Sequence, residues 1–293
     1  MSRIEPREGI RMRRKTVFVV VLALAVTTTV GYLAGAAAGP GVSSSGGHDV
    51  STPAFSRVVF LSHVNNPARI PVFPGDPPFR TTTAFTVPTD GFYLQYVKEG
   101  EHTGTHYSAP CHFHVGARCA EDLDPGDFLL PASVVDVRGK VRADVDYHVT
   151  VADLKAWEGV HGAFPKESAV LLRTGCDRYW GPEIGRHIPT YYNCGSAHGR
   201  FRQPGFSRRA VNWLIARGVL GTRGALGTDT FGPDPGDDPN FVETWLTLRR
   251  HRFTLENLTN LGSMPTTGGW VVIGGPRNRH GSGAPSTVFG LSP

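Results

Sequence analysis

The stretch HTGTHYSAPCHFH, residues 102–114, places four histidines within thirteen positions. Two β-branched threonines around Gly104 disfavour a helix, and Pro110 closes that possibility just downstream. We therefore expect an extended chain, in which alternate side chains share one face. Four side chains of this ribbon then point into the same space: His102, His106, Ser108 and His112.

Imidazoles gathered in one space indicate a metal site or a proton-transfer site. Neutral imidazole is the commonest zinc ligand, and a further histidine without a metal bond can act as a general base. The alternative is a set of hydrogen-bonded structural histidines in a loop, which three histidines on one face disfavour. A nucleophilic Cys111 activated by His112 is a third hypothesis, but neighbours on an extended chain point to opposite sides.

A candidate acid lies far along the chain, in HRFTLENLTNL, residues 251–261. Its apolar surroundings predict a strand in which the carboxylate of Glu256 is buried. A buried glutamate needs a partner, and either a metal ion or an arginine such as Arg249 or Arg250 would serve. These residues alone leave the choice open.

Strand-like and helix-like segments alternate along the chain. Thr150 and Ser207 are expected N-caps of two helices, and Asp153 lies in the first turn of the earlier one. The expected helices cover residues 150–162 and 207–219, and the expected strands cover 56–64, 91–106, 129–139, 168–175, 224–232, 251–261 and 268–276. This alternation predicts a mixed α/β class. The uneven lengths and long loops argue against a Rossmann sheet or a TIM barrel.

The first residues have the pattern of an export signal. A basic start precedes the apolar run Val17–Ala38, which contains no charged residue and is long enough to span a bilayer. Residues 1–39 are therefore expected to be a signal peptide or an N-terminal membrane anchor. Residues 40–55 follow as a flexible linker and 56–293 as the folded domain, placed outside the cytoplasm and either secreted or anchored.

The net charge of +5 comes mostly from the first fifteen residues. Removing the six basic and two acidic residues of that segment from the totals of 30 and 25 leaves 24 and 23. No basic stripe then remains for nucleic acid, and the N-terminal segment is the only membrane contact expected. Cysteines 111, 119, 176 and 194 could form two disulfides in an oxidising compartment, with three connectivities open.

The histidine stretch resembles the H-x-G-T-H-x-D-x-P-x-H signature of the cyclase family, which includes bacterial kynurenine formamidases and isatin hydrolases. Further family pieces follow in order across roughly residues 57–293. They are VVFLSHV, PVFPGDPPF, PASVVDV, LLRTG, PGFSRRAVNWLIARGV, LGTDTFG, LENLTNL and GSGAPSTVFGL. The resemblance implies a swivelling β/β/α fold, with mixed sheets and flanking helices, that assembles as a homo-oligomer.

The resemblance also implies a divalent metal ion, zinc or manganese, that activates water. His102, His106 and Glu256 correspond to the family's metal ligands. His112 corresponds to the catalytic histidine, and Phe73 lies on the loop that lines the substrate pocket in relatives.

Two positions depart from the family pattern. The aspartate of the motif is Ser108 here, and a serine hydroxyl is a poor, uncharged ligand. Relatives also carry a histidine about a dozen residues before the late glutamate, where this chain has Thr244. Glu243 or Asp229 could supply a further group. We therefore expect one metal ion rather than two.

The predicted function is a metal-dependent hydrolase acting on a small molecule. Metal-activated water would open the amide bond of an aryl formamide, such as formylkynurenine in tryptophan catabolism, or a cyclic lactam or lactone. The alternative is an exported binding protein without catalytic activity, whose metal site is degenerate at Ser108 and Thr244.

Overall fold

The computed structural model describes residues 55–181, 190–196 and 200–293. The predicted signal or anchor segment 1–39 lies outside these ranges, as does the predicted linker 40–55 apart from its last residue. The described residues belong to one compact unit bounded by Ser51 and Pro293. Within them, no helix has both the length and the apolar character needed to cross a bilayer.

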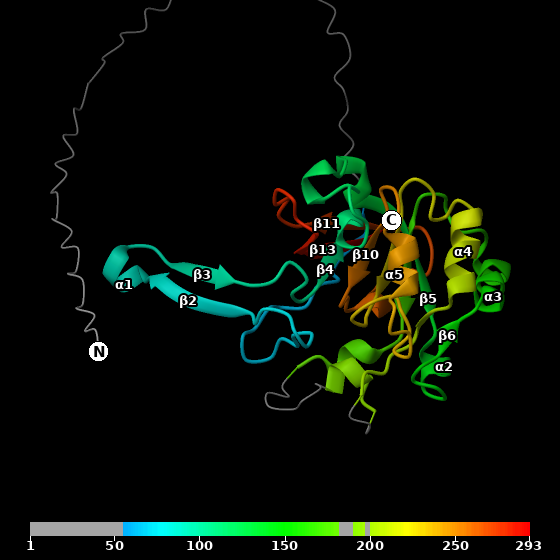
Figure 1. Ribbon diagram of the computed structural model, residues 1–293, viewed down its shortest axis with the longest axis horizontal. Coiled ribbons are helices and arrows are strands. Elements are labelled where there is room, and N and C mark those ends of the chain that lie inside the picture. Colours follow the sequence, from blue (N-terminus) through cyan, green and yellow to red (C-terminus); the bar gives the residue numbers. More distant parts are fainter. Residues whose placement is uncertain (1–54, 182–189, 197–199) are drawn as a thin grey trace, which may run out of the picture. The chain divides into compact units, whose positions relative to one another are not determined.

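The described residues alternate strands with short helices (Figure 1). The strands are β1 (Arg57–Phe60), β2 (Arg80–Phe85), β3 (Leu94–Lys98), β4 (His106–Ser108), β5 (Leu129–Asp136), β6 (His148–Val149), β7 (Ala169–Arg173), β8 (Gly205–Phe206), β9 (Ala225–Thr228), β10 (Phe253–Glu256), β11 (Gly269–Gly274), β12 (Gly283–Pro285) and β13 (Thr287–Ser292). The α-helices are α1 (Val87–Asp90), α2 (Arg138–Val141), α3 (Val151–His161), α4 (Arg208–Ala216) and α5 (Val242–Thr247). The predicted mixed α/β class is confirmed.

The main sheet has nine strands in the order β1-β13-β11-β5-β7-β9-β10-β4-β12. Its centre, β5-β7-β9-β10, is parallel, and the strands on both sides of this centre pair antiparallel. The sheet curls, because the chain just after β1 reaches the chain just after β10. Ser62 forms an isolated bridge with Leu258, and the Thr259 amide donates to the Leu61 carbonyl at 3.0 Å.

The central strands are buried on both faces, as parallel strands usually are. In β7, Ala169 and Leu171 join the core on one face, while Val170 and Leu172 join the core on the other. Helices α3 and α4 lie side by side over this second face (Figure 1). The core on the first face includes Tyr107, which anchors the histidine strand β4.

The predicted N-cap residues are confirmed. The Thr150 hydroxyl accepts the Asp153 amide at 3.3 Å and the Asp153 carboxylate accepts the Thr150 amide at 2.8 Å, which is a capping box. The Ser207 hydroxyl accepts the Ala210 amide at 3.2 Å at the start of α4.

Replacing Asp153 with asparagine is expected to destabilise the protein by about 1–2 kcal/mol at pH 7. Burial alone would raise the pKa of Asp153, but Lys140, the Tyr147 hydroxyl and Thr150 together lower it to about 2. A carboxyl whose folded pKa lies below its unfolded value stabilises the fold above that unfolded value, and this contribution fades as the pH falls toward 2. Thermal unfolding at pH 7 and about pH 3 measures this. An equal loss at both pH values would contradict the assignment.

The predicted strand over residues 91–106 is wrong in its second half. Strand β3 ends at Lys98 because it pairs only with β2, in a hairpin that extends away from the main sheet (Figure 1). In the histidine stretch, only His106–Ser108 is a strand. Gly104 has a positive φ of 63°, and Pro110–His112 forms a 3₁₀-helix. The chain therefore turns on both sides of β4.

Candidate functional site

Strand pairing brings the late glutamate to the histidine stretch. Strands β10 and β4 run antiparallel, and in their register Glu256 lies directly opposite His106. Directly opposed residues on one face of a sheet have neighbouring side chains. The pairing of the two strands thus brings together residues that are 150 positions apart in the sequence. The His106 Nε2 and Glu256 Oε2 atoms lie 3.4 Å apart.

His106 and Glu256 are buried, with 3% and 9% of their surfaces exposed. The His106 Nδ1–H donates to the Gly104 carbonyl at 2.9 Å, which directs Nε2 toward the glutamate. Burial would lower the pKa of His106, but Glu256 raises it above its ordinary value. Burial would likewise raise the pKa of Glu256, but His106 and the Thr254 hydroxyl lower it to about 2. Glu256 is therefore ionised.

Two hydroxyl groups fix the other oxygen of this carboxylate. The Glu256 Oε1 atom accepts hydrogen bonds from Thr254 Oγ1 at 2.6 Å and from Ser108 Oγ at 3.1 Å. The Oε2 atom remains directed toward His106. No arginine takes this place: among the described residues, Arg249 lies over the Trp245 ring instead.

His102 completes the group from a loop rather than from a strand. Its Nδ1 lies 3.2 Å from Ser108 Oγ and its Nε2 lies 2.9 Å from Ser282 Oγ. Burial, followed by the neighbouring histidines, lowers the pKa of His102 to about 3, so the ring is neutral. Ser108 donates its hydroxyl proton to Glu256, and Ser282 donates its own to Glu101. The N–H of the neutral His102 ring can therefore donate to one serine oxygen, while its acceptor nitrogen receives a proton from neither serine.

His112 stacks on His102, with ring centroids 4.0 Å apart. The His102 and His106 rings meet edge to face at 5.1 Å. The three histidine rings therefore lie together as predicted. The His112 ring is placed there by the 3₁₀-helix that starts at Pro110, and not by the alternation of side chains along a strand. Partial desolvation of the ring lowers the pKa of His112 below 6.5, although the negative charge of Glu256 partly offsets this effect. His112 is thus neutral at pH 7 while its surface stays exposed.

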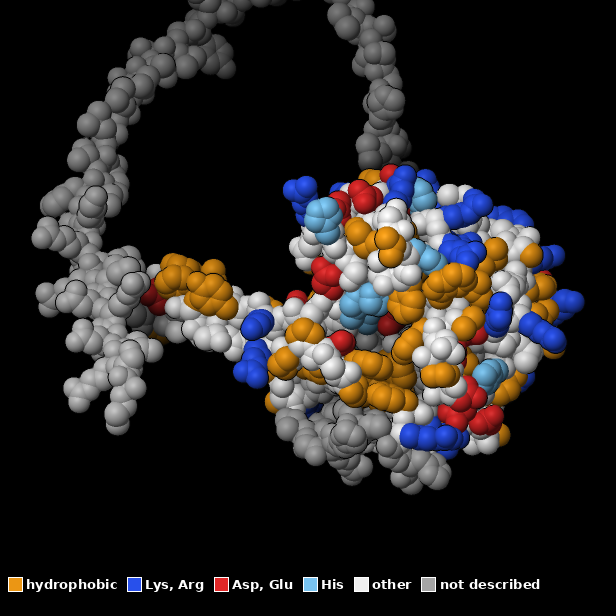
Figure 2. All heavy atoms as spheres, viewed as in Figure 1, with side chains coloured by type: hydrophobic (Ala, Val, Ile, Leu, Met, Phe, Trp, Pro, Cys, Tyr) orange, Lys and Arg blue, Asp and Glu red, His pale blue; other side chains and the backbone are white. Residues whose placement is uncertain are grey.

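These groups face a cavity of about 260 Å³. Its lining residues are Phe73, Asp76, His102, His106, His112, Phe113, Tyr192, Phe231, Gly232, Asp234, Phe241, Thr244, Glu256 and Asn257. Phe73 anchors an aromatic wall, with ring centroids 5.9 Å from Tyr192 and 5.6 Å from Phe231. Figure 2 shows histidine side chains bordered by hydrophobic ones on this face of the molecule.

Two predicted contributors do not reach the cavity. The buried Asp229 carboxylate accepts the Thr174 and Gly175 amides and the Thr174 hydroxyl, so it holds the turn after β7. Glu243 is also buried, but it faces Asp234 from the first turn of α5. Neither side chain lines the cavity.

The cavity also contains residues that sequence reasoning missed. Asp76 follows Phe73 on the same loop, and Asp234 precedes α5. The side-chain Nδ2 of Asn257 donates to the Gly104 carbonyl at 2.7 Å and thereby supports the turn that carries His106. Asp76 belongs to the family segment PVFPGDPPF, so its place beside Phe73 in the sequence could have identified it as a cavity residue. The position of Asn257 depends on strand register, which the sequence does not reveal.

The cysteines form the bonds Cys111–Cys119 and Cys176–Cys194. The predicted pair of disulfides is confirmed, and one of the three connectivities is selected. A nucleophilic Cys111 is excluded because its sulfur is bonded to Cys119.

The donor set fits one divalent cation. Two atoms each about 2.1 Å from a tetrahedral zinc ion lie about 3.4 Å apart. The His106 Nε2 and Glu256 Oε2 atoms have this separation. A cation there would replace the proton that the two groups otherwise share. The neutral ring of His102 offers a third donor if it exchanges one serine hydroxyl for the ion.

The chain belongs to the cyclase family, since the family described as Putative cyclase matches residues 59–235. Isatin hydrolase of Roseibium aggregatum is 29% identical over 207 residues, which cover 69% of this chain and 76% of the relative. Kynurenine formamidase of Bordetella pertussis is 24% identical over 190 residues, with 64% and 76% covered.

Solved structures have the same fold. Isatin hydrolase A from Ralstonia solanacearum superposes with a TM-score of 0.70 at 27% identity, covering 81% of this chain and 92% of that one. An isatin hydrolase bound to the product analogue thioisatinate gives a TM-score of 0.71 at 25% identity, with 80% and 92% covered. The cyclase-like fold expected from the sequence is confirmed.

Proposed function

We propose that this chain is a metal-dependent hydrolase that opens the amide bond of an aryl formamide, or a cyclic lactam or lactone. The observation that carries the proposal is the His106–Glu256 pair at the wall of an aromatic cavity, beside a neutral His112. Relatives named isatin hydrolase and kynurenine formamidase support the reaction class. The aromatic wall around Phe73 suits a flat aryl group.

His106 and Glu256 would hold one zinc or manganese ion, with His102 as the third protein ligand. When bound, the ion supplies a Lewis acid that polarises the substrate carbonyl and acidifies water. The hydroxyls of Ser108 and Thr254 orient Glu256 through its other oxygen. We propose a single ion because Ser108 offers no carboxylate that could bridge two.

His112 would move the proton. Its imidazole accepts a proton from the water whose oxygen bonds to the substrate carbonyl carbon. It then returns that proton to the nitrogen as the carbon–nitrogen bond breaks, which yields a carboxylic acid and an amine. In a lactone, the ring oxygen receives the proton and an alcohol is released.

Activity of the full chain before and after metal loading tests this proposal. Chelator-treated protein, reloaded with zinc or with manganese, is offered an N-formyl aryl amine, an isatin-type lactam and an aryl lactone. We expect turnover of at least one class only after loading, at one ion per chain. Protein that binds one ion and turns over none of the three would overturn the catalytic proposal.

One observation favours the alternative of a non-catalytic binding protein. The Ser108 and Thr254 hydroxyls donate to one oxygen of Glu256, and His106 faces the other, so this carboxylate has partners without an ion. Elemental analysis separates the two functions. Protein that carries no metal when purified, and takes up neither zinc nor manganese, would overturn the metal-dependent hydrolase and favour the binding function.

We also propose that the chain works as a homo-oligomer outside the cytoplasm. Two disulfides support an oxidising compartment. The hairpin of β2 and β3 supports self-association, because Phe92, Tyr93 and Tyr96 are each more than half exposed. Thiol titration of the unfolded, unreduced protein should find no free thiol, and light scattering should report more than one chain. A monomer with four free thiols would contradict both parts.

A further inference from the structure

Three carboxylates meet where the loop after β9 enters α5. They belong to Asp234, Asp238 and Glu243. One oxygen of each lies within 4.8 Å of the others. Asp234 and Glu243 are buried, with 2% and 4% of their surfaces exposed, and Asp238 is half-buried.

Backbone amides hold two of these carboxylates in place. Asp234 Oδ1 accepts the amides of Glu243 at 2.8 Å and Thr244 at 2.9 Å. Asp238 Oδ2 accepts the amide of Val242 at 2.7 Å. The two amides occupy both lone pairs of Asp234 Oδ1, and the Thr244 hydroxyl donates to Asp234 Oδ2. These bonds orient the carboxylates and leave one lone pair free on Asp234 Oδ2 and one on Asp238 Oδ2.

One oxygen of the third carboxylate lacks a hydrogen-bond partner. Among the described residues, no group donates to the buried Glu243 Oε2. Across the described ranges, no lysine, arginine or histidine nitrogen lies within 4.0 Å of any of the three acids. His148 contacts the same loop, but it pairs with Asp237. Buried charge without a counter-ion is costly, so such a group acquires a proton or a cation.

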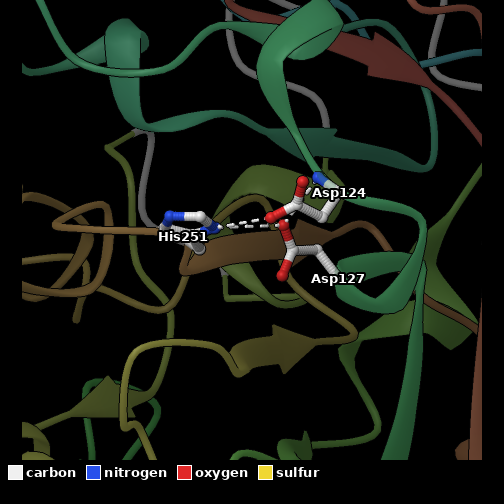
Figure 3. A group of neighbouring side chains, drawn as sticks. All are labelled: Asp124, Asp127 and His251. Atoms are coloured by element: carbon white, nitrogen blue, oxygen red, sulfur yellow. Dashed lines mark hydrogen bonds and ion pairs between the residues drawn. The ribbon is translucent and has the colours of Figure 1, made fainter.

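A second acidic group in the molecule provides a contrast. Asp124, Asp127 and His251 also converge (Figure 3). Their charge is already balanced, because Arg223 Nε lies 3.4 Å from Asp127 Oδ1 and Arg118 Nη1 lies 3.4 Å from Asp124 Oδ2. That group needs no further cation, whereas no arginine, lysine or histidine among the described residues balances the charge of the group at α5.

We propose that Asp234, Asp238 and Glu243 bind a hard divalent cation of the calcium class that fastens the loop after β9 to α5. Oxygen-only donors select calcium or magnesium over zinc, whereas the His106–Glu256 pair offers nitrogen as well. The bound ion would also order one wall of the cavity, because Asp234 and Thr244 line it. This inference does not depend on the proposed hydrolysis.

Thermal unfolding of the chelator-treated full chain, with calcium chloride as the probe, tests the site. Millimolar calcium is expected to raise the Tm by about 3–8 °C. Glu243→Gln should abolish the rise, while His106→Ala, which disables the proposed cavity site, should retain it. Asp237→Asn removes a neighbouring charge outside the group and should also retain the rise.

Two outcomes would overturn the proposal. If calcium leaves the Tm of the unmodified chain unchanged, a proton occupies the group instead. If His106→Ala loses the rise and Glu243→Gln keeps it, the ion binds in the cavity. Should Glu243→Gln fail to fold, calorimetric titration decides: one calcium per His106→Ala chain supports the site, and none contradicts it.

Discussion

Replacing His112 with alanine is expected to lower kcat/KM by roughly 10²–10⁴-fold, the usual contribution of a positioned general base. His112 is neutral, stacks on His102 and faces the cavity, but it is not paired with Glu256 as His106 is. Metal content, measured by elemental analysis, should therefore remain at one ion per chain. Loss of the metal from this variant would show that His112 is a ligand.

His114→Ala provides the matched control. This histidine lies on the same segment, but its Nε2 is 2.8 Å from the Trp245 carbonyl and it does not line the cavity. It should keep nearly full activity. The pH profile gives a second readout: because the pKa of His112 is lowered, activity should decline only below pH 6.5. That acid limb should disappear in His112→Ala.

Replacing Glu256 with glutamine is expected to weaken metal binding by more than about 100-fold, since even supporting residues of metal sites contribute 10–100-fold. The substitution keeps the shape and removes the charge that faces His106 Nε2 at 3.4 Å. Competition with a chromophoric chelator measures the affinity. Phe73→Leu, which alters the cavity wall but removes no donor atom, should bind metal as tightly as the unmodified chain. Unchanged affinity in Glu256→Gln would remove the glutamate from the site.

Ser108→Asp tests the same site in the opposite direction. Ser108 Oγ lies 3.1 Å from Glu256 Oε1, so an aspartate there places a second carboxylate against the first. Without metal, repulsion should lower the Tm; with zinc or manganese, the extra ligand should raise affinity above that of the unmodified chain. A variant that binds metal no better would indicate that the site cannot use the carboxylate of the family motif.

Local sequence patterns predicted the parts of the fold that depend on local chemistry. Thr150 and Ser207 cap their helices because a hydroxyl there can bond an amide three residues on, which is visible in the sequence. The parallel strands were recognisable from their apolar runs. The predicted strand over residues 91–106 included β3, but β2 was not predicted because it is mostly exposed and carries no such run. The hairpin was therefore missed.

The candidate site was predictable in its members but not in its geometry. The spacing of the histidines suggested a shared face, yet Pro110 starts a 3₁₀-helix and Gly104 takes a positive φ. From the sequence of the late strand, the partner of the Glu256 carboxylate could be either a metal ion or an arginine. Only the register between β4 and β10 shows that Glu256 faces His106. Long-range register of this kind is set by the whole sheet.

The most direct test of the metal site is a crystal of the zinc-loaded chain with diffraction recorded on both sides of the zinc absorption edge. If His106 and Glu256 hold the ion, an anomalous peak will lie between His106 Nε2 and Glu256 Oε2, within about 2.0–2.2 Å of each. Zinc bound elsewhere, with these two side chains still in direct contact, would contradict this assignment.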